Sequence, residues 1–247
     1  MSNPILNENT FVEGNTYQNY QIEGVMTKSG VVTKTTGLLL LVVFSGILAC
    51  LRVLSNPESA NLLMILGAVG GLITVIITAF KRNITHFLAP VYAIFEGLFI
   101  GVASLYFESL FPGIVLQAVF GTFAVFFTLL ALYSSRMIVV TQKMRAAIFS
   151  VTIAIALVYL VAFLLSFAHI RIPFLYDNSP VGIGVGIVIT IIAAANFLID
   201  FDNIERGVNS SAPKYYEWYC SLGLLVTLVW VYIEILKLLA RFAGRRR

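Results

Sequence analysis

Seven long apolar segments dominate this sequence, and they constrain its fold more than any other feature. Each is close to the roughly 20 residues that a helix needs to cross the hydrocarbon core of a bilayer. Their apolar residues are continuous rather than alternating, which favours helices over the strands of a barrel. The pattern predicts an all-α membrane protein, a seven-transmembrane helix bundle with spans at 36–55, 61–80, 87–107, 114–135, 146–169, 181–202 and 216–240.

The composition agrees with a chain that lies mostly in lipid. Of the 247 residues, 59% are hydrophobic and only 11% are charged, whereas a soluble domain carries roughly 25% charged residues. The basic residues lie at the ends of spans and form no patch, so we expect a lipid bilayer and not nucleic acid as the partner. Two histidines and two separate cysteines, Cys50 and Cys220, cannot build a zinc or haem site, and we expect no cofactor.

The distribution of Lys and Arg predicts the orientation. If the N-terminus is cytoplasmic, the loops on the opposite side hold only Arg52 and Arg171, as the positive-inside rule requires. The cytoplasmic connections then hold Lys28, Lys34, Lys81, Arg82, Arg136, Lys143, Arg145, Arg206 and Lys214. Seven crossings place the C-terminal Arg241, Arg245, Arg246 and Arg247 outside, against this rule. The alternative is a last segment that re-enters without crossing, but we favour seven crossings.

The chain divides into three parts by composition. Residues 1–32 are polar and predicted to form a disordered cytoplasmic tail, 33–242 form the seven-helix domain, and 243–247 form a basic tail. Glycines four residues apart occur on three spans, which predicts close helix packing in a compact bundle. These glycines are Gly67 and Gly71, Gly97 and Gly101, and Gly182 and Gly186.

Acidic residues inside the spans are the candidate functional positions, because a charge in hydrocarbon costs a few kcal/mol even on lenient insertion scales. Glu96 lies near the middle of the third span. It is either hydrogen-bonded to a neighbouring helix or involved in transport or gating. Glu234 lies in the last span, where Lys237 is three residues away and could pair with it. The alternative is that Glu234 faces the interior of the bundle while Lys237 extends toward water.

Three more acids end the sixth span, within the stretch FLIDFDNIERGV at 197–208. Asp200 is the deepest, and Asn196 and Asn203 support it on one polar helix face. Asp202 and Glu205 point elsewhere, and we expect them to be solvated charges at the end of the helix. His86 and His169 lie at span ends, where a histidine usually has no special role.

The entry to the first span, MTKSGVVTKTTGLLLL, resembles the bacterial branch of the Bax inhibitor-1 family of membrane proteins. Three further stretches resemble this family. They are AIFEGLFIG, NFLIDFDNIERG and APKYYEWYCSLGLLVTLVWVYIEILKLL. The resemblance implies a seven-helix fold with the last helix central, in a bacterial cell membrane. It also implies a calcium leak that protons gate through two carboxylates, which correspond to Asp200 and Glu234. The second of these is usually aspartate in the family, and here it is glutamate.

Such a pair has a clear physical logic. Two neighbouring carboxylates cannot both ionise cheaply, so they share a proton and hold their helices together. Deprotonated, they repel one another or bind Ca²⁺, which prefers carboxylate oxygens.

Helix geometry makes contact between Asp200 and Glu234 difficult. Asp200 is about 8 Å deep if its helix ends near Glu205, whereas Glu234 is about 28 Å deep if its helix begins at Tyr215. The pair can meet only if the sixth helix is longer, or if residues 215–222 lie at the membrane surface.

Two classes of function remain open on these grounds. The first is a pH-sensitive cation path for Ca²⁺ that uses Asp200, Glu234 and Glu96. The second is a non-transporting regulator that binds another membrane protein, such as a membrane protease. Enzymatic activity is not expected, because Ser166 and His169 provide only a spacing that is common by chance.

Overall fold

The computed structural model describes residues 24–167 and 177–245, and these form a bundle of seven long helices. They are α2 (Lys28–Ser55), α3 (Ser59–Phe80), α4 (Thr85–Leu110), α5 (Ile114–Ser134), α6 (Gln142–Phe167), α8 (Pro180–Asn209) and α9 (Tyr216–Arg245), with a short 3₁₀ turn, η2 (Arg82–Ile84), before α4. All seven are long and apolar enough to cross a membrane. The predicted all-α seven-span fold is therefore confirmed.

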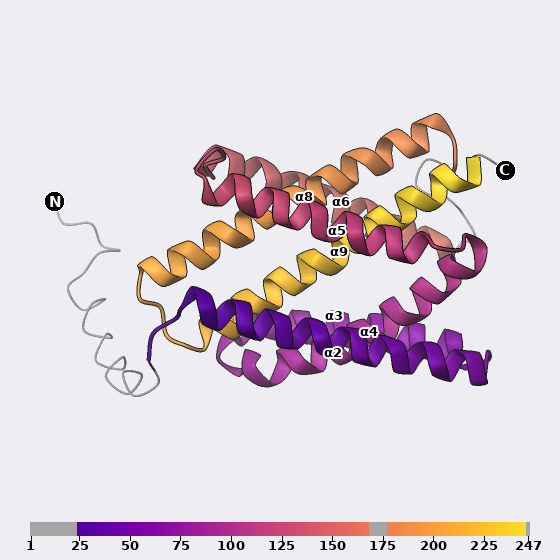
Figure 1. Cartoon of the computed structure of the whole chain (residues 1–247), viewed down its shortest axis with the longest axis horizontal. Coiled ribbons are helices and arrows are strands. Elements are labelled where there is room, and N and C mark those ends of the chain that lie inside the picture. Colours follow the sequence, from indigo (N-terminus) through magenta and orange to yellow (C-terminus); the bar gives the residue numbers. More distant parts are fainter. Residues whose placement is uncertain (1–23, 168–176, 246–247) are drawn as a thin grey trace.

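The last helix, α9, forms the centre of the bundle. Figure 1 shows α9 running diagonally between a group of three helices, α2, α3 and α4, and a second group, α5, α6 and α8. It packs against α2, α4, α5 and α8. In its most apolar stretch 56% of the residues are buried, more than in any other span. The expected central position of the last helix is confirmed.

Close packing holds the first group together, and glycines make it possible. Gly97 and Gly101 of α4 face α2, where a Cβ on Gly101 would lie 2.8 Å from the Cα of Gly46. On the other side of α4, the backbone of Gly67 lies against Phe95 and Phe99. Small residues let helix backbones approach in lipid, where no hydrophobic effect drives them together. The glycines of the sequence therefore mark the helix contacts, as predicted.

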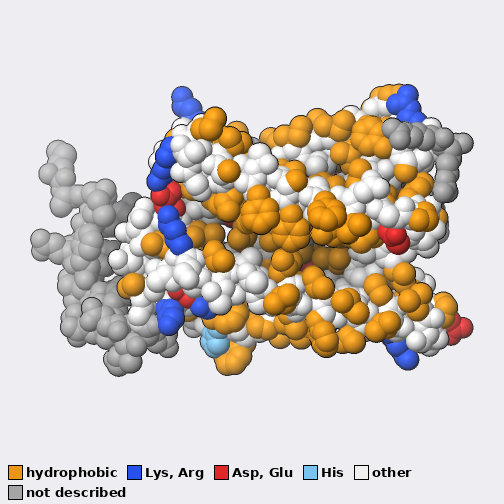
Figure 2. Space-filling view, in the orientation of Figure 1, with side chains coloured by type: hydrophobic (Ala, Val, Ile, Leu, Met, Phe, Trp, Pro, Cys, Tyr) orange, Lys and Arg blue, Asp and Glu red, His pale blue; other side chains and the backbone are white. Residues whose placement is uncertain are grey.

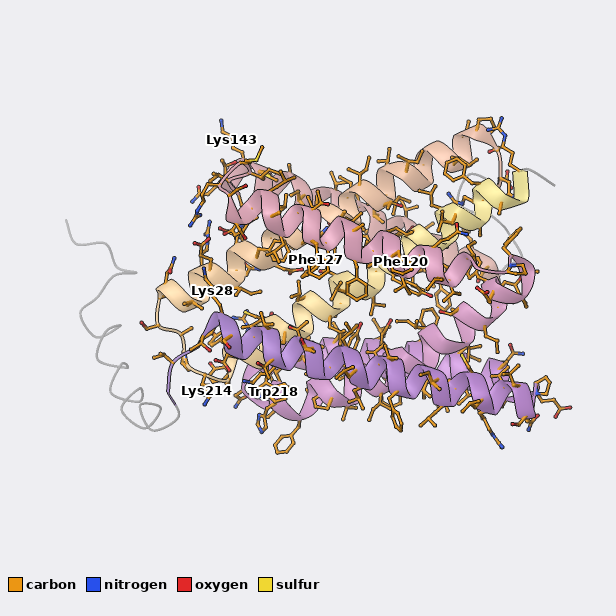
Figure 3. All side chains as sticks on the ribbon, viewed as in Figure 1. Lys28, Phe120, Phe127, Lys143, Lys214 and Trp218 are labelled. Atoms are coloured by element: carbon orange, nitrogen blue, oxygen red, sulfur yellow. The ribbon has the colours of Figure 1, made fainter. Side chains whose placement is uncertain are left out.

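The two ends of the bundle differ in charge. Figure 2 shows Lys and Arg side chains gathered at the end where α2 begins, next to a band of hydrophobic side chains. Lys28, Lys143 and Lys214 lie at this end in Figure 3, which we call the basic end. Phe120 and Phe127 are exposed on the middle of α5, as expected for side chains that meet lipid. The arrangement defines a multi-pass membrane protein, and α9 continues unbroken to the opposite end instead of re-entering.

The first helix begins earlier than predicted. It starts at Lys28, where the Thr27 hydroxyl accepts a hydrogen bond from the Gly30 backbone N–H and caps the helix. Residues 24–26 extend from it and pair with the chain before α9, through Met26 N–H to Ala212 C=O and Lys214 N–H to Gly24 C=O. The predicted tail is therefore ordered from residue 24 onward, and its first 23 residues lie outside the described ranges.

Candidate ion site

A cavity of about 1520 Å³ enters the bundle from the basic end. It lies between the ends of α3, α8 and α9, and its wall is completed by residues 24–26 and 210–215. Apolar side chains line its inner part, among them Val75, Leu222 and Val226. Tyr215, Tyr216 and Tyr219 lie toward its mouth, where the Arg82 guanidinium is 5.2 Å from the centre of the Tyr219 ring. The cavity therefore runs from the basic end of the bundle into its hydrophobic interior.

Asp200 is the acid on the wall of this cavity. It faces the first half of α9, where a Cβ on Gly223 would lie 3.8 Å from its Oδ1 atom and where the Thr227 hydroxyl is beside it. Its Oδ2 atom is buried and has no hydrogen-bond partner among the described residues. A carboxylate oxygen without a partner is costly in such surroundings. Folding alone gives no reason for an acid here.

A second buried acid, Glu217 at the start of α9, does not line the cavity and is fully paired. Its carboxylate accepts hydrogen bonds from the Thr27 backbone N–H (2.9 Å) and the Thr27 hydroxyl (3.0 Å), and it forms an ion pair with Lys34. Glu217 is only 1% exposed. These contacts hold the start of α2 and the adjoining residues 24–26 against the start of α9. We call Thr27, Lys34 and Glu217 the entrance clamp.

The structure does not bring Asp200 and Glu234 together. Glu234 lies two helical turns beyond Thr227 on α9, about 10 Å along the axis, and its Oε1 atom accepts from Lys237 Nζ (2.6 Å) and from the Tyr159 hydroxyl (3.1 Å). The mismatch in depth that the sequence indicates is therefore real, although α8 extends to Asn209. The residue of α9 that faces Asp200 is Thr227.

The two asparagines expected to support Asp200 contact α6 instead. Asn196 donates to the Thr152 hydroxyl (3.0 Å) and to the backbone carbonyl of Ile192. Asn203 lines the cavity with Asp200, but its side-chain oxygen accepts a hydrogen bond from Arg145 (2.7 Å). Sequence spacing places both asparagines near Asp200 on the same face of α8. Their hydrogen-bond partners, however, depend on α6, which packs beside them.

Asp202 and Glu205 are not the solvated charges that we expect from the sequence. Asp202 forms ion pairs with Arg145 of α6 and with Arg206 one turn later on α8. Glu205 accepts from the Tyr133 hydroxyl and from Arg136, at the end of α5. The prediction is wrong because α8 extends beyond Glu205, so Glu205 meets Arg136 just after α5 and Asp202 meets Arg145 near the start of α6.

Glu96 lies at another helix contact, away from Asp200. Its Oε2 atom would be 3.1 Å from a Cβ on Gly71 of α3, and Tyr92 hydrogen-bonds to it from one turn earlier on α4. Tyr92 is buried and packs in the cluster that contains Leu222, which lines the cavity. Glu96 therefore lies behind the cavity wall and not on it.

Several residues of the site are difficult to recognise in the sequence. Thr227 is an ordinary polar residue in a span. Only a comparison of its depth with the depth of Asp200 would indicate that the two residues face each other. Glu217 has the appearance of a membrane-surface residue within the aromatic stretch KYYEWYC. Tyr159 gives no signal at all, because tyrosine is common in membrane helices. His169 lies outside the described residues, and His86 contacts the Asn83 carbonyl and the Phe87 ring at the surface.

The described residues contain no group of three or more His, Cys, Asp or Glu side chains that could hold a metal ion. A cation in the cavity would therefore meet one carboxylate, that of Asp200, with neutral oxygens from Thr227 and Asn203 nearby. Ca²⁺ takes six to eight oxygen ligands when it is tightly bound. The site suits a hydrated cation in passage better than a permanently bound one.

Seven spans, with the last helix central and an acid on the wall of a cavity that enters from one end, define a polytopic α-helical membrane protein. A family model described as Bax inhibitor 1 like matches residues 3–244. The chain therefore belongs to the Bax inhibitor 1 like family. No curated protein and no solved structure shows a significant match to it.

Proposed function

We propose that this protein is a pH-sensitive leak path for cations, with Ca²⁺ as the physiological ion, and that Asp200 is its ion-binding and pH-sensing residue. The observation that carries the proposal is the unpartnered Oδ2 atom of Asp200 beside a cavity that water can enter. Ionisable residues within membrane spans are expensive and usually mark ion pathways.

The proposed role of Asp200 needs no second carboxylate. When it is ionised, its negative charge attracts a cation from the cavity into the bundle. When it is protonated, that attraction is lost, and the acid becomes a neutral neighbour of Thr227. Cation flux should therefore rise with pH on the cavity side.

The state described here is closed beyond Asp200. Phe197 and Leu198 of α8 pack with Leu224, Leu228 and Val231 of α9 in one buried hydrophobic cluster. A hydrophobic constriction of this kind excludes water and ions until helices move apart. The proposed leak is therefore slow, because its path opens only when these helices separate.

The distribution of charge supports one orientation of the protein in the membrane. We infer that the basic end, with residue 24 and the start of α2, faces the cytoplasm, because cytoplasmic connections carry the excess of Lys and Arg. The membrane is the cell membrane of a bacterium, by the resemblance to the bacterial branch of the family. The cavity then opens to the cytoplasm.

The experiment is a Ca²⁺ flux assay in proteoliposomes that contain the purified protein and an internal indicator dye. Flux through the wild-type protein should increase from acidic to neutral pH, and Asp200→Asn should give a low flux that no longer depends on pH. Glu58→Gln is the control, because it also replaces a carboxylate by an amide, at an exposed acid before α3.

A flux in Asp200→Asn that matches the wild-type protein at every pH would refute the role of Asp200. Absence of Ca²⁺ flux in the wild-type protein, together with a stable partner recovered by crosslinking in membranes, would favour the non-transporting regulator instead.

A further inference from the structure

The helix α6 is the least buried span of the protein. Only 11% of its most apolar stretch is buried, and large apolar side chains such as Leu157, Leu160 and Phe163 are exposed along it. Its helix packing is mainly against α8. A helix with so few packing contacts depends on other interactions to keep its place against the bundle.

Three polar contacts fix α6 to the bundle at three depths. At the basic end, Arg145 binds Asp202 and Asn203 of α8. In the middle, the Thr152 hydroxyl accepts from Asn196 of α8. Nearer the opposite end, the Tyr159 hydroxyl donates to Glu234 of α9 and accepts from Lys237 Nζ at 2.9 Å.

A small groove lies beneath α6 between the second and third of these contacts. Its volume is about 310 Å³, and it is lined by Thr152, Ile155, Ala156 and Tyr159 of α6 and by Trp230 of α9. Asn196, which holds Thr152, is one turn from Asp200 along α8, and Trp230 is one turn from Glu234 along α9, in each case about 6 Å. The line from Asp200 to Glu234 therefore passes Asn196 and then the groove.

We propose that the second half of the cation path runs along this line beneath α6, and that the Tyr159 hydroxyl closes it by bridging Glu234 and Lys237. The inference rests on the proposed function and extends it from the cavity toward the other membrane surface. It gives Glu234 a role although this acid does not meet Asp200.

The chemistry of the closed contact explains how it blocks a cation. The Lys237 ammonium neutralises the Glu234 carboxylate at 2.6 Å and is itself a positive charge that repels other cations. Tyr159 keeps both groups engaged and holds α6 to α9 at the same time. Movement of α6 away from α9 would break both hydrogen bonds of Tyr159 and widen the groove, while Glu234 and Lys237 stay paired on α9.

Tyr159→Phe tests the proposal, because it removes one hydroxyl and keeps the ring. Loss of a hydrogen bond to charged partners should favour the open arrangement about tenfold, and Ca²⁺ flux in proteoliposomes should rise accordingly. Tyr106→Phe is the matched control, since Tyr106 is 58% exposed on α4 and far from this contact in the sequence. It should leave the flux unchanged.

A second measurement does not depend on Ca²⁺ flux. Ala156→Cys, in a protein whose Cys50 and Cys220 are replaced by alanine, places a thiol in the groove. A charged, membrane-impermeant thiol reagent should label it slowly in the Tyr159 background and about tenfold faster with Tyr159→Phe.

The two measurements separate the two proposals. Equal labelling rates with Tyr159 and with Tyr159→Phe would overturn the inference, whatever the flux. Faster labelling without Ca²⁺ flux in any variant would support an opening beneath α6 and refute the Ca²⁺ leak itself.

Discussion

The entrance clamp gives a prediction with a magnitude that follows from its contacts. Glu217→Ala removes the acceptor for both hydrogen bonds of Thr27 and the partner of Lys34. Each hydrogen bond to a charged group contributes about 1.5–3 kcal/mol, while Lys34, whose side chain is 17% exposed, can turn to water and lose less. Removing one partner of a buried ion pair generally costs about 3–5 kcal/mol. We therefore expect the free energy of unfolding to fall by about 3–4 kcal/mol.

Reversible unfolding in mixed lipid and detergent micelles, with a denaturing detergent as titrant, can measure this loss. Trp218 provides a local fluorescence signal, because its ring lies 5.3 Å from Lys34 Nζ, and circular dichroism reports the helices as a whole. Glu58→Ala is the control, since Glu58 is exposed before α3 and surface substitutions usually change stability by less than about 0.5 kcal/mol. If Glu217→Ala were as mild as Glu58→Ala, the reasoning from buried paired charge would be wrong.

Two further predictions concern packing and the cavity acid. Gly101→Ala should lower the free energy of unfolding by about 1–3 kcal/mol, because its Cβ would meet the α2 backbone. Gly37→Ala, where nothing lies within 4 Å of the new Cβ, should instead raise it by up to about 1 kcal/mol. The same titration measures both, and equal signs would contradict the role of close helix approach. Asp200→Asn should raise the free energy of unfolding by about 1–2 kcal/mol, because it removes a buried charge with an unpartnered oxygen. The same variant should suppress flux. A lower free energy of unfolding would mean that Asp200 stabilises the fold.

The sequence predicts the membrane fold well because lipid leaves a chain few alternatives. Seven continuous apolar segments long enough to cross, three of them without Asp, Glu, Lys or Arg, favour helices over the alternating strands of a barrel. The glycines four residues apart predict contacts that the structure confirms, as at Gly67 and Gly101. The helix ends are less predictable. α2 begins eight residues before the expected span because the Thr27 cap and the Glu217 contact extend it past the apolar stretch.

The candidate site is predictable in its residue types but not in its partners. Burial of an acid in a span identifies Asp200, Glu234 and Glu96 without any structure. Which group each acid meets depends on the relative depth and rotation of two helices, and a shift of one turn changes the partner. Asp200 therefore faces Thr227, while Glu234 meets Tyr159 from a helix that the sequence does not connect with it. Asp202 departs from expectation for the same reason.

The central position of α9 has a consequence for how the protein is made. Synthesis proceeds from the N-terminus, so the other six spans enter the membrane before the 30 residues of α9 are complete. Until then, α2, α3 and α4 can pack on one another, but α2, α4, α5 and α8 lack the face that α9 supplies. The helices can insert one by one, but the two groups can join around α9 only after the last helix has been released. A ribosome that stops early in α9 would leave the two groups of helices without the helix that joins them, and Asp200 without Thr227, which it faces.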